Sequence, residues 1–189
     1  STITGYIQEN DMDKLRNYFD SSIVTSSSIL VNQDDTLARL SLIKVTEIKG
    51  LLYTKMVQAM NRQLDVSFEL TQEITELSTD LLTLSRVLGI FLDNAIEAEQ
   101  KEQEQEIHLN MEVVDEMFNL IVENHIQNSV LCVNPKLVTS KKNKAEHGLG
   151  IPTVREIVNQ YQGFLNISEE ANNMIVHMVI PLANFAKNR

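Results

Sequence analysis

The sequence predicts an α+β two-layer sandwich, in which a mixed sheet packs against helices, preceded by an α-helical segment. Apolar residues recur at three- to four-residue spacing through the first 60 residues, which contain no proline. From residue 64 onward, runs that alternate apolar and polar residues indicate strands with one buried face, and helical stretches separate these strands. We therefore predict a helical segment over residues 1–62 and an α/β domain over residues 63–189.

The N-terminal segment is expected to contain two amphipathic helices. The first has its apolar residues between Tyr6 and Ile23, and Asp11 is placed to cap it. Polar residues at 26–28 and 32–35 interrupt the pattern, and a second helix is predicted over residues 45–59. Two isolated helices could not bury these apolar stripes, so we expect them to pack together or with a second copy of the chain.

The α/β domain is predicted to contain a strand, a helix, two strands, an irregular segment, a helix and two strands. In that order, the predicted bounds are residues 64–70, 80–100, 107–114, 118–122, 125–147, 151–161, 164–168 and 174–180. Asp80 is placed to cap the first helix, and Gly163 to stop the second. Turns at Asp115-Glu116 and Asn172-Asn173 would join the two strand pairs.

Composition excludes several classes of protein. No run approaches 18 apolar residues and no signal-peptide pattern is present. The single cysteine, Cys132, excludes a disulfide framework and suits a reducing cytosol. The net charge of −10 is a poor match for nucleic acid. Residues 136–147 nevertheless hold four lysines and one acid, Glu146, and this local charge favours a small anionic ligand.

Asp93 and Asn94 form the first candidate site. They lie at the margin of the apolar stripe of the 80–100 helix, where an amide can face a cavity while the helix stays packed. Magnesium takes oxygen ligands and keeps several waters, so one Asn oxygen with phosphate oxygens makes a reasonable site. Taken alone, such a pair is more often the polar edge of a helix.

Gly148-Leu149-Gly150 forms the second candidate site, at the start of the 151–161 helix. Glycine lets a backbone approach a phosphate closely, and a helix N-terminus points N–H groups and a positive dipole end at an anion. Pro152 suits the first turn of that helix. A plain loop-to-helix turn can contain the same residues, but the lysines just upstream favour a phosphate.

Together, these motifs resemble those of a known family. Leu92-Asp93-Asn94-Ala95 is similar to the N box, and Gly148-Leu149-Gly150 to the glycine box, of the Bergerat-fold (GHKL) ATPases, which include gyrase, Hsp90, MutL and histidine kinases. The predicted order of elements also fits that fold. Residues 6–19, 45–52 and 89–98 more specifically resemble the peptide-pheromone quorum-sensing histidine kinases of Gram-positive bacteria, of the accessory-gene-regulator type.

The resemblance implies ATP and Mg²⁺ as cofactors. Asn94 would hold the metal, the glycines would lie against the phosphates, and residues 125–147 would form an ATP lid. The cofactor-binding residues implied are Asp93, Asn94, Asn124, Lys142, Lys144, His147, Gly148, Leu149 and Gly150.

Two departures from the family pattern matter. Where the family has an Asp in a DxGxG box, this chain has Glu123-Asn124-His125, so Asn124 is assigned to adenine through its side-chain oxygen. ATP-hydrolysing relatives carry a Glu four residues before the helix Asn, and that place is Ile90 here, which cannot act as a base. Phosphoryl transfer to another residue, which needs mainly positioning and charge stabilisation, fits better than hydrolysis.

The phosphoacceptor is expected outside this chain. His108 and His177 lie in strand-like runs, whereas His125 and His147 flank the lid. In the family, the acceptor histidine precedes the segment that matches Tyr6. The chain is therefore expected to be a fragment that binds Mg·ATP but cannot phosphorylate itself.

The resemblance also implies partners and location. It implies a homodimer through the N-terminal helices, a response regulator as protein partner, and a cytoplasmic location as part of a membrane-bound sensor. One alternative is a degenerate, non-catalytic Bergerat domain that acts as a dimerisation or scaffold module, which Glu123-Asn124-His125 supports. Another is a serine kinase of the anti-sigma-factor type, which Ile90 disfavours.

Overall fold

The computed structural model describes residues 34–77, 79–99, 106–126, 128–134 and 150–182. Contacts along the chain divide it into two compact units, residues 1–37 and 38–189. The helix expected between Tyr6 and Ile23, with its Asp11 cap, lies outside the described residues. The second unit contains the sheet.

The order of elements confirms the prediction for the α/β domain. The elements are α3 (Asp34–Ser41), α4 (Thr46–Met60), β1 (Asp65–Leu70), α5 (Leu81–Glu99), β2 (Glu106–Val114), β3 (Met117–His125), α6 (Val130–Val133), α7 (Ile151–Gln160), β4 (Phe164–Glu170) and β5 (Asn173–Pro181). Two short helices differ from expectation. Helix α3 begins at Asp34, where a break was predicted, and α6 lies inside the segment predicted to be irregular.

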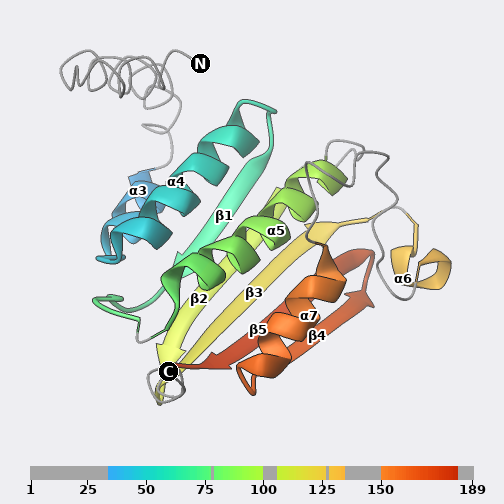
Figure 1. The fold of residues 1–189 in the computed structure, drawn as a ribbon. Helices are drawn as coiled ribbons and strands as arrows, with labels where there is room; N and C mark the ends of the chain where they lie inside the picture. Colours follow the sequence, from blue (N-terminus) through green and yellow to red (C-terminus); the bar gives the residue numbers. More distant parts are fainter. Residues whose placement is uncertain (1–33, 78, 100–105, 127, 135–149, 183–189) are drawn as a thin grey trace, which may run out of the picture. The chain divides into compact units, whose positions relative to one another are not determined.

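The five strands form one mixed sheet in the order β1-β2-β3-β5-β4. Strands β1 and β2 are parallel and all other neighbours are antiparallel. A parallel pair needs a crossover connection, which α5 supplies. Helices α4, α5 and α7 cover one face of the sheet, so the predicted two-layer arrangement is confirmed (Figure 1).

The core lies between the helix layer and the covered face of the sheet. Burial alternates along β1 and β3, so every second residue points toward the helices. Phe68, Phe91 and Phe118 are completely or almost completely buried. Helix α5 buries the stripe predicted for it, with Leu81 only half-buried at its first turn.

Helix α4 packs with the sheet domain. Its buried residues, among them Leu52 and Met56, face α5 and β1. Helix α5 and strand β1 cover the apolar stripe of α4, so this helix needs no other partner on that side. The division by contacts falls at residues 37 and 38. The domain boundary at 62–63 expected from composition stays a prediction.

Local turn and cap chemistry is partly as predicted. The Asp80 carboxylate accepts hydrogen bonds from the backbone N–H groups of Leu82 and Thr83, which confirms the cap of α5. Asp115 and Glu116 have φ of 51° and 60°, the conformation of a two-residue hairpin turn. The predicted turn of the second hairpin was wrong by one residue: Ala171 and Asn172 form it, and Asn173 already belongs to β5.

The stop of α7 also differs from its prediction. The left-handed residue after this helix is Gln162, with φ 51°, and not Gly163. Gly163 is required for another reason, because a Cβ there would lie 2.6 Å from the carbonyl oxygen of Val179. The glycine allows the chain to pass closely over β5.

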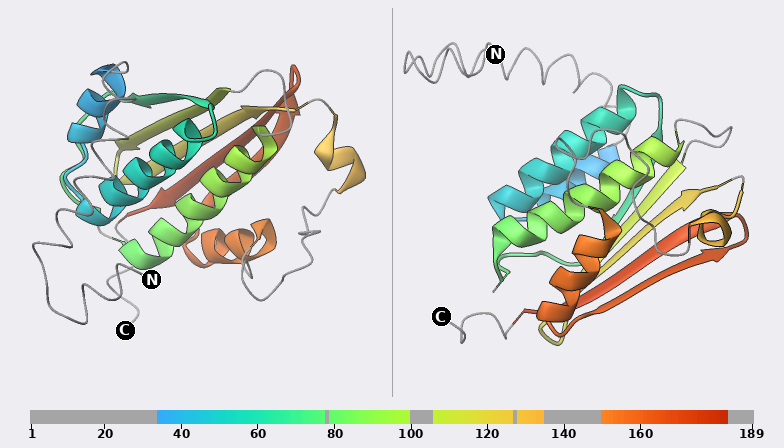
Figure 2. Two further views of the ribbon diagram at one scale, coloured as in Figure 1. Left: turned by 90° about the horizontal axis from the view of Figure 1, so that it is seen from above. Right: turned by 45° about the vertical axis from the view of Figure 1, so that its right-hand side comes forward.

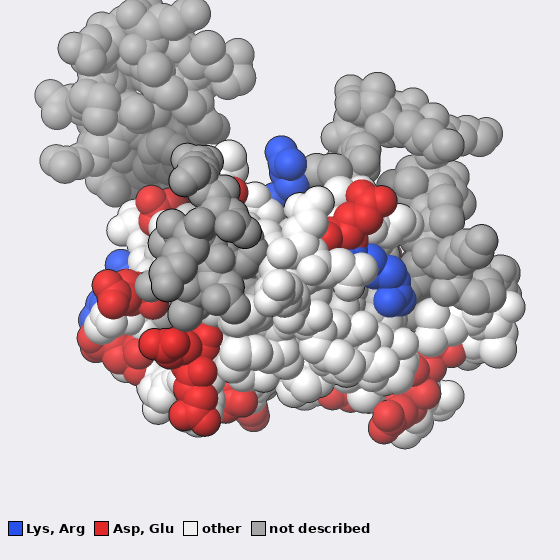
Figure 3. Space-filling view, turned by 60° about the horizontal axis from the view of Figure 1, so that its bottom comes forward, with Lys and Arg blue, Asp and Glu red and all other residues white. Residues whose placement is uncertain are grey.

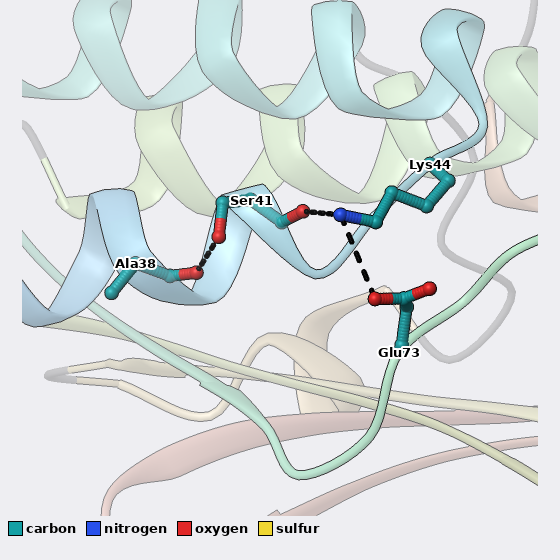
Figure 4. Close-up of polar contacts among 4 residues, drawn as sticks. All are labelled: Ala38, Ser41, Lys44 and Glu73. Carbon is teal, nitrogen blue, oxygen red and sulfur yellow. Dashed lines mark hydrogen bonds and ion pairs between the residues drawn. The ribbon is translucent and has the colours of Figure 1, made fainter.

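Polar contacts join the end of α3 to the connection between β1 and α5 (Figure 4). The Ser41 hydroxyl donates to the carbonyl of Ala38 (2.6 Å), and the Lys44 ammonium donates to the carbonyl of Ser41 (3.0 Å) and lies 3.6 Å from Glu73. Both charged side chains are about half exposed, so this ion pair adds little stability. The backbone N–H of Lys44 also donates a hydrogen bond to the carbonyl of Ile74, and this bond holds the segment more firmly than the ion pair does.

Candidate nucleotide site

Asn124 is a buried amide at the end of a strand. It is the last but one residue of β3 and its side chain lies on the helix-covered face, 5% exposed. Its amide nitrogen donates to the carbonyl of His125 (3.1 Å). With the nitrogen engaged, the side-chain oxygen is the atom that could accept a hydrogen bond from a ligand amino group. Burying a polar side chain is costly unless it is hydrogen-bonded, and the bond to His125 offsets part of this cost.

Asn94 lies on α5, outside the buried stripe. It is exposed, whereas the neighbouring Leu92, Ala95 and Ile96 are buried. The margin predicted from the helical wheel is therefore confirmed. An exposed amide held on a packed helix can bind a ligand without disturbing the core.

The register of the sheet brings the Asn94 turn and Asn124 to one level. Ile107 is the cross-strand partner of Asn124. Ile107 also lines, together with Leu92 and Ile96, a small apolar void of about 10 Å³ between the helices and the sheet. The turn of α5 that contains Asn94 thus lies over the strands next to Asn124.

Gly150 begins α7 as its N-cap. It is extended (φ −104°), and its carbonyl accepts the N–H groups of Thr153 (3.0 Å) and Val154 (3.2 Å). A Cβ at this position would meet Pro152 Cδ only at 3.6 Å, so packing does not require a glycine here. Close approach of a ligand to the helix N-terminus would require it.

Helices α4, α5 and α7 lie side by side, with α5 in contact with both of the others (Figure 2). Helix α5, which holds Asn94, therefore packs both on β3, which holds Asn124, and on α7, which Gly150 caps. The remaining predicted phosphate-side residues, Lys142, Lys144, His147, Gly148 and Leu149, lie outside the described residues.

Asp93 makes a contact that the sequence did not indicate. Its Oδ1 lies 2.5 Å from the ammonium of Lys55 on α4. The predicted cofactor residue Asp93 is thus engaged between the two helices. Since residues 93 and 94 are about 100° apart around the helix, Asp93 faces α4 while Asn94 remains exposed.

The histidines in strands face away from the site. Ile107 and Val176 are buried under the helices, so the next residues, His108 and His177, point to the opposite face of the sheet. His108 lies 3.5 Å from Glu106, and His177 contacts the ring of Phe164 edge-on. Their interpretation as sheet-face residues is confirmed.

Sequence reasoning missed the role of Glu169 on β4. Its carboxylate accepts hydrogen bonds from the Ser129 hydroxyl (2.5 Å) and from the backbone N–H groups of Val130 (2.7 Å) and Leu131 (2.8 Å). Ser129 is the N-cap of α6, and its oxygen accepts the N–H of Cys132. The only local signal was a serine before a short apolar run. The contact holds the chain that follows Asn124 against the sheet.

The Glu169 contact gives a pH prediction. The Ser129 hydroxyl first, then the backbone N–H groups, lower the pKa of Glu169 from its ordinary 4.5. A lowered pKa means that the contribution of Glu169 is fully present above pH 4.5 and is lost as the pH falls through the folded-state pKa. In an NMR titration, the amide signals of Val130 and Leu131 should shift with a midpoint below 4.5.

The variant Glu169→Gln should abolish that transition. Glu170→Gln, a change at the adjacent exposed position of the same strand, should leave it in place. A midpoint at or above 4.5, or a transition that persists in Glu169→Gln, would contradict the assignment.

The face of the molecule in Figure 3 carries more negative than positive charge. Acidic side chains outnumber basic ones on the face drawn in Figure 3, in agreement with the net charge of −10. Among the described residues, no group of three or more His, Cys, Asp or Glu side chains is arranged to hold a metal ion. No helix among the described residues is long and apolar enough to cross a membrane.

A model of the GHKL domain matches residues 79–181, from the cap of α5 to the end of β5. The chain belongs to the GHKL family. The matched region includes Asn94, Asn124 and Gly150 within the GHKL domain. Curated protein sequences gave no match.

Solved histidine kinases share the fold of this GHKL domain. The nucleotide-free catalytic domain of histidine kinase ThkA is 18% identical with a TM-score of 0.56, over 72% of this chain and 90% of that one. Acinetobacter baumannii histidine kinase AdeS is 18% identical with a TM-score of 0.50, over 97% and 94%. ThkA in complex with response regulator protein TrrA is 17% identical with a TM-score of 0.58, over 96% and 57%. The predicted histidine-kinase ATPase fold is thereby confirmed.

Proposed function

We propose that this GHKL domain is the ATP-binding catalytic domain of a two-component sensor histidine kinase of the peptide quorum-sensing type. It would transfer the γ-phosphoryl group of Mg·ATP to a histidine on a dimerisation helix outside this chain. The observation that supports this best is the buried amide of Asn124, at a strand end and level with the α5 turn that holds Asn94.

The donor set fits a magnesium nucleotide. In this proposal the oxygen of Asn124 accepts from the adenine amino group, and the exposed oxygen of Asn94 completes the shell of a magnesium ion held by phosphates. The glycines ending at Gly150 lie against the phosphates, with Lys142 and Lys144 supplying positive charge. When bound, Mg²⁺ neutralises charge on the transferred phosphoryl group.

Transfer is favoured over hydrolysis by the side chains near the metal position. Ile90, one helical turn before Asn94, offers no group to activate water. His108 and His177 face away from the helix layer, so neither is placed to accept a phosphoryl group from this domain. The acceptor is therefore proposed to come from outside the domain, as in the resemblance to quorum-sensing kinases.

Partners follow from the same proposal. The phosphorylated histidine would pass its group to a response regulator, and ThkA, which shares the fold, has been solved with one. We also propose dimerisation through the N-terminal helices and a cytoplasmic position in a membrane-bound sensor. The signal would be a peptide, on the resemblance of residues 6–19, 45–52 and 89–98.

Calorimetry of the chain with Mg·ATP tests the proposal. One nucleotide should bind per chain, and Asn124→Ala should lower the affinity roughly tenfold, because a lost hydrogen bond to a buried acceptor is worth about 1–1.5 kcal/mol. Asn124→Asp retains an acceptor oxygen and should bind ATP. Asn119→Ala, on the same strand but the opposite face, is the matched control and should have no effect.

The non-catalytic scaffold remains the second candidate. The backbone next to Asn124 favours this candidate. Strand β3 continues through His125, which pairs with Asn173, where the family pattern has glycines. If the folded chain gives no binding heat with Mg·ATP, the scaffold function is supported and the kinase proposal fails.

A further inference from the structure

We propose that Lys55 is a positioning residue for the metal end of the site, acting through Asp93 on the α5 turn that holds Asn94. The inference rests on the proposed nucleotide function and adds a residue from α4 to it. It also gives Asp93 a role different from direct contact with the nucleotide. The Lys55–Asp93 pair links positions 38 residues apart in the sequence.

The pair lies in partly buried surroundings. The Lys55 side chain is 17% exposed and that of Asp93 43%, which distinguishes the pair from the half-exposed pair of Lys44 and Glu73. Lys55 also lines the apolar void beneath, so its aliphatic stem packs while its ammonium reaches the carboxylate. A charge pair over an apolar layer interacts more strongly than one surrounded by water.

The contact adds a polar restraint, on the side facing α4, to the α5 turn that holds Asn94. Leu92 and Ile96 fix the inner side of the helix, whereas Asn94 is exposed. Asp93 lies next to Asn94, so holding its carboxylate on α4 limits rotation and sliding of this turn. Magnesium demands near-ideal octahedral geometry, and binding sites lose function when ligands move by more than about 0.5 Å.

A weakened pair should therefore affect metal-dependent binding before it affects folding. Lys55→Met retains an apolar stem for the void and a good helix former while removing the charge. We expect it to lower Mg·ATP affinity roughly threefold to tenfold, with ATP affinity in EDTA unchanged. Asp93→Asn should lower Mg·ATP affinity to a similar extent. The exchange of charges, Lys55→Glu with Asp93→Lys, should restore part of the loss.

Lys44→Met is the matched control. It removes a lysine from an exposed ion pair on the segment before α4 and should leave Mg·ATP affinity unchanged. Thermal unfolding of every variant separates positioning from stability, since a merely structural pair would lower the melting temperature and leave Mg·ATP affinity of the folded chain intact.

The outcomes are distinguishable from failure of the proposed function. If the unmodified chain does not bind Mg·ATP, the nucleotide proposal itself fails. If it binds and Lys55→Met has no effect, the positioning role alone is wrong. The inference would also be overturned if Asp93→Asn strongly lowered Mg·ATP affinity while Lys55→Met left it unchanged, because Asp93 would then act directly at the nucleotide.

Discussion

Replacing Asn94 by alanine should reduce Mg·ATP affinity by at least about tenfold while the fold is retained. Even partners of metal ligands typically account for 10- to 100-fold in metal affinity, so loss of a ligand oxygen should have no smaller effect. Asn94 is exposed and alanine is the better helix former, so the melting temperature should be unchanged or slightly higher. Calorimetry with Mg²⁺ and with EDTA measures the ATP affinity with and without the metal.

The metal dependence makes the Asn94 experiment specific. In EDTA, Asn94→Ala and the unmodified chain should bind ATP equally weakly. Asn94→Asp retains an oxygen ligand and should keep part of the Mg²⁺-dependent affinity. The control is Asn159→Ala, which changes an exposed asparagine at the C-terminal end of α7. This variant should bind Mg·ATP with unchanged affinity. Full Mg·ATP affinity in Asn94→Ala would remove Asn94 from the site.

The largest effect on stability is expected at Gly163. An added Cβ would lie 2.6 Å from the carbonyl oxygen of Val179, 2.9 Å from Ile180 Cγ2 and 3.1 Å from Val158 Cγ1. Ile180 and Val158 are buried, so the backbone must shift, and overpacking of this kind costs about 1–3 kcal/mol. In a chain of this size, Gly163→Ala should lower the melting temperature by roughly 2–12 °C.

Gly50→Ala provides the matched control, because it makes the same chemical change with the opposite expected sign. Gly50 is exposed inside α4, and a Cβ there meets nothing within 4 Å. Alanine should stabilise the helix by about 0.5–1 kcal/mol. A Gly163→Ala variant that unfolds at the same temperature as Gly50→Ala would show that the close passage over β5 does not constrain the chain.

Elements with a strong local pattern could be predicted from the sequence. The alternation of β1 and β3 and the stripe of α5 depend only on side chains spaced at the period of each element, so neighbouring residues contain the information. Asn94 was placed correctly at the helix margin for the same reason. The hairpin turn at Ala171 and Asn172 was predicted one residue late, because asparagine is a favoured turn residue and alanine is not, and only the pairing of Glu170 with Asn173 places the turn at Ala171 and Asn172.

Contacts between distant segments could not be predicted. The Ser129–Glu169 bond spans 40 residues and the Lys55–Asp93 bond spans 38. The charged residues in these contacts are common at the surface of any domain, and nothing in the local sequence distinguishes them from solvated side chains. The inclusion of α4 in the sheet domain likewise depends on α5 and β1 covering its stripe.

By itself, the sequence determined the order of the five strands and of helices α5 and α7, the face that each strand buries, and the amide at the margin of α5. These follow from periodicity and local capping, which act over a few residues. Only the tertiary structure decided which strands are neighbours, that Asn124 is buried level with the Asn94 turn, and that Asp93 faces Lys55. Those features arise when the crossover through α5 brings remote segments together, and no local pattern encodes the resulting distances.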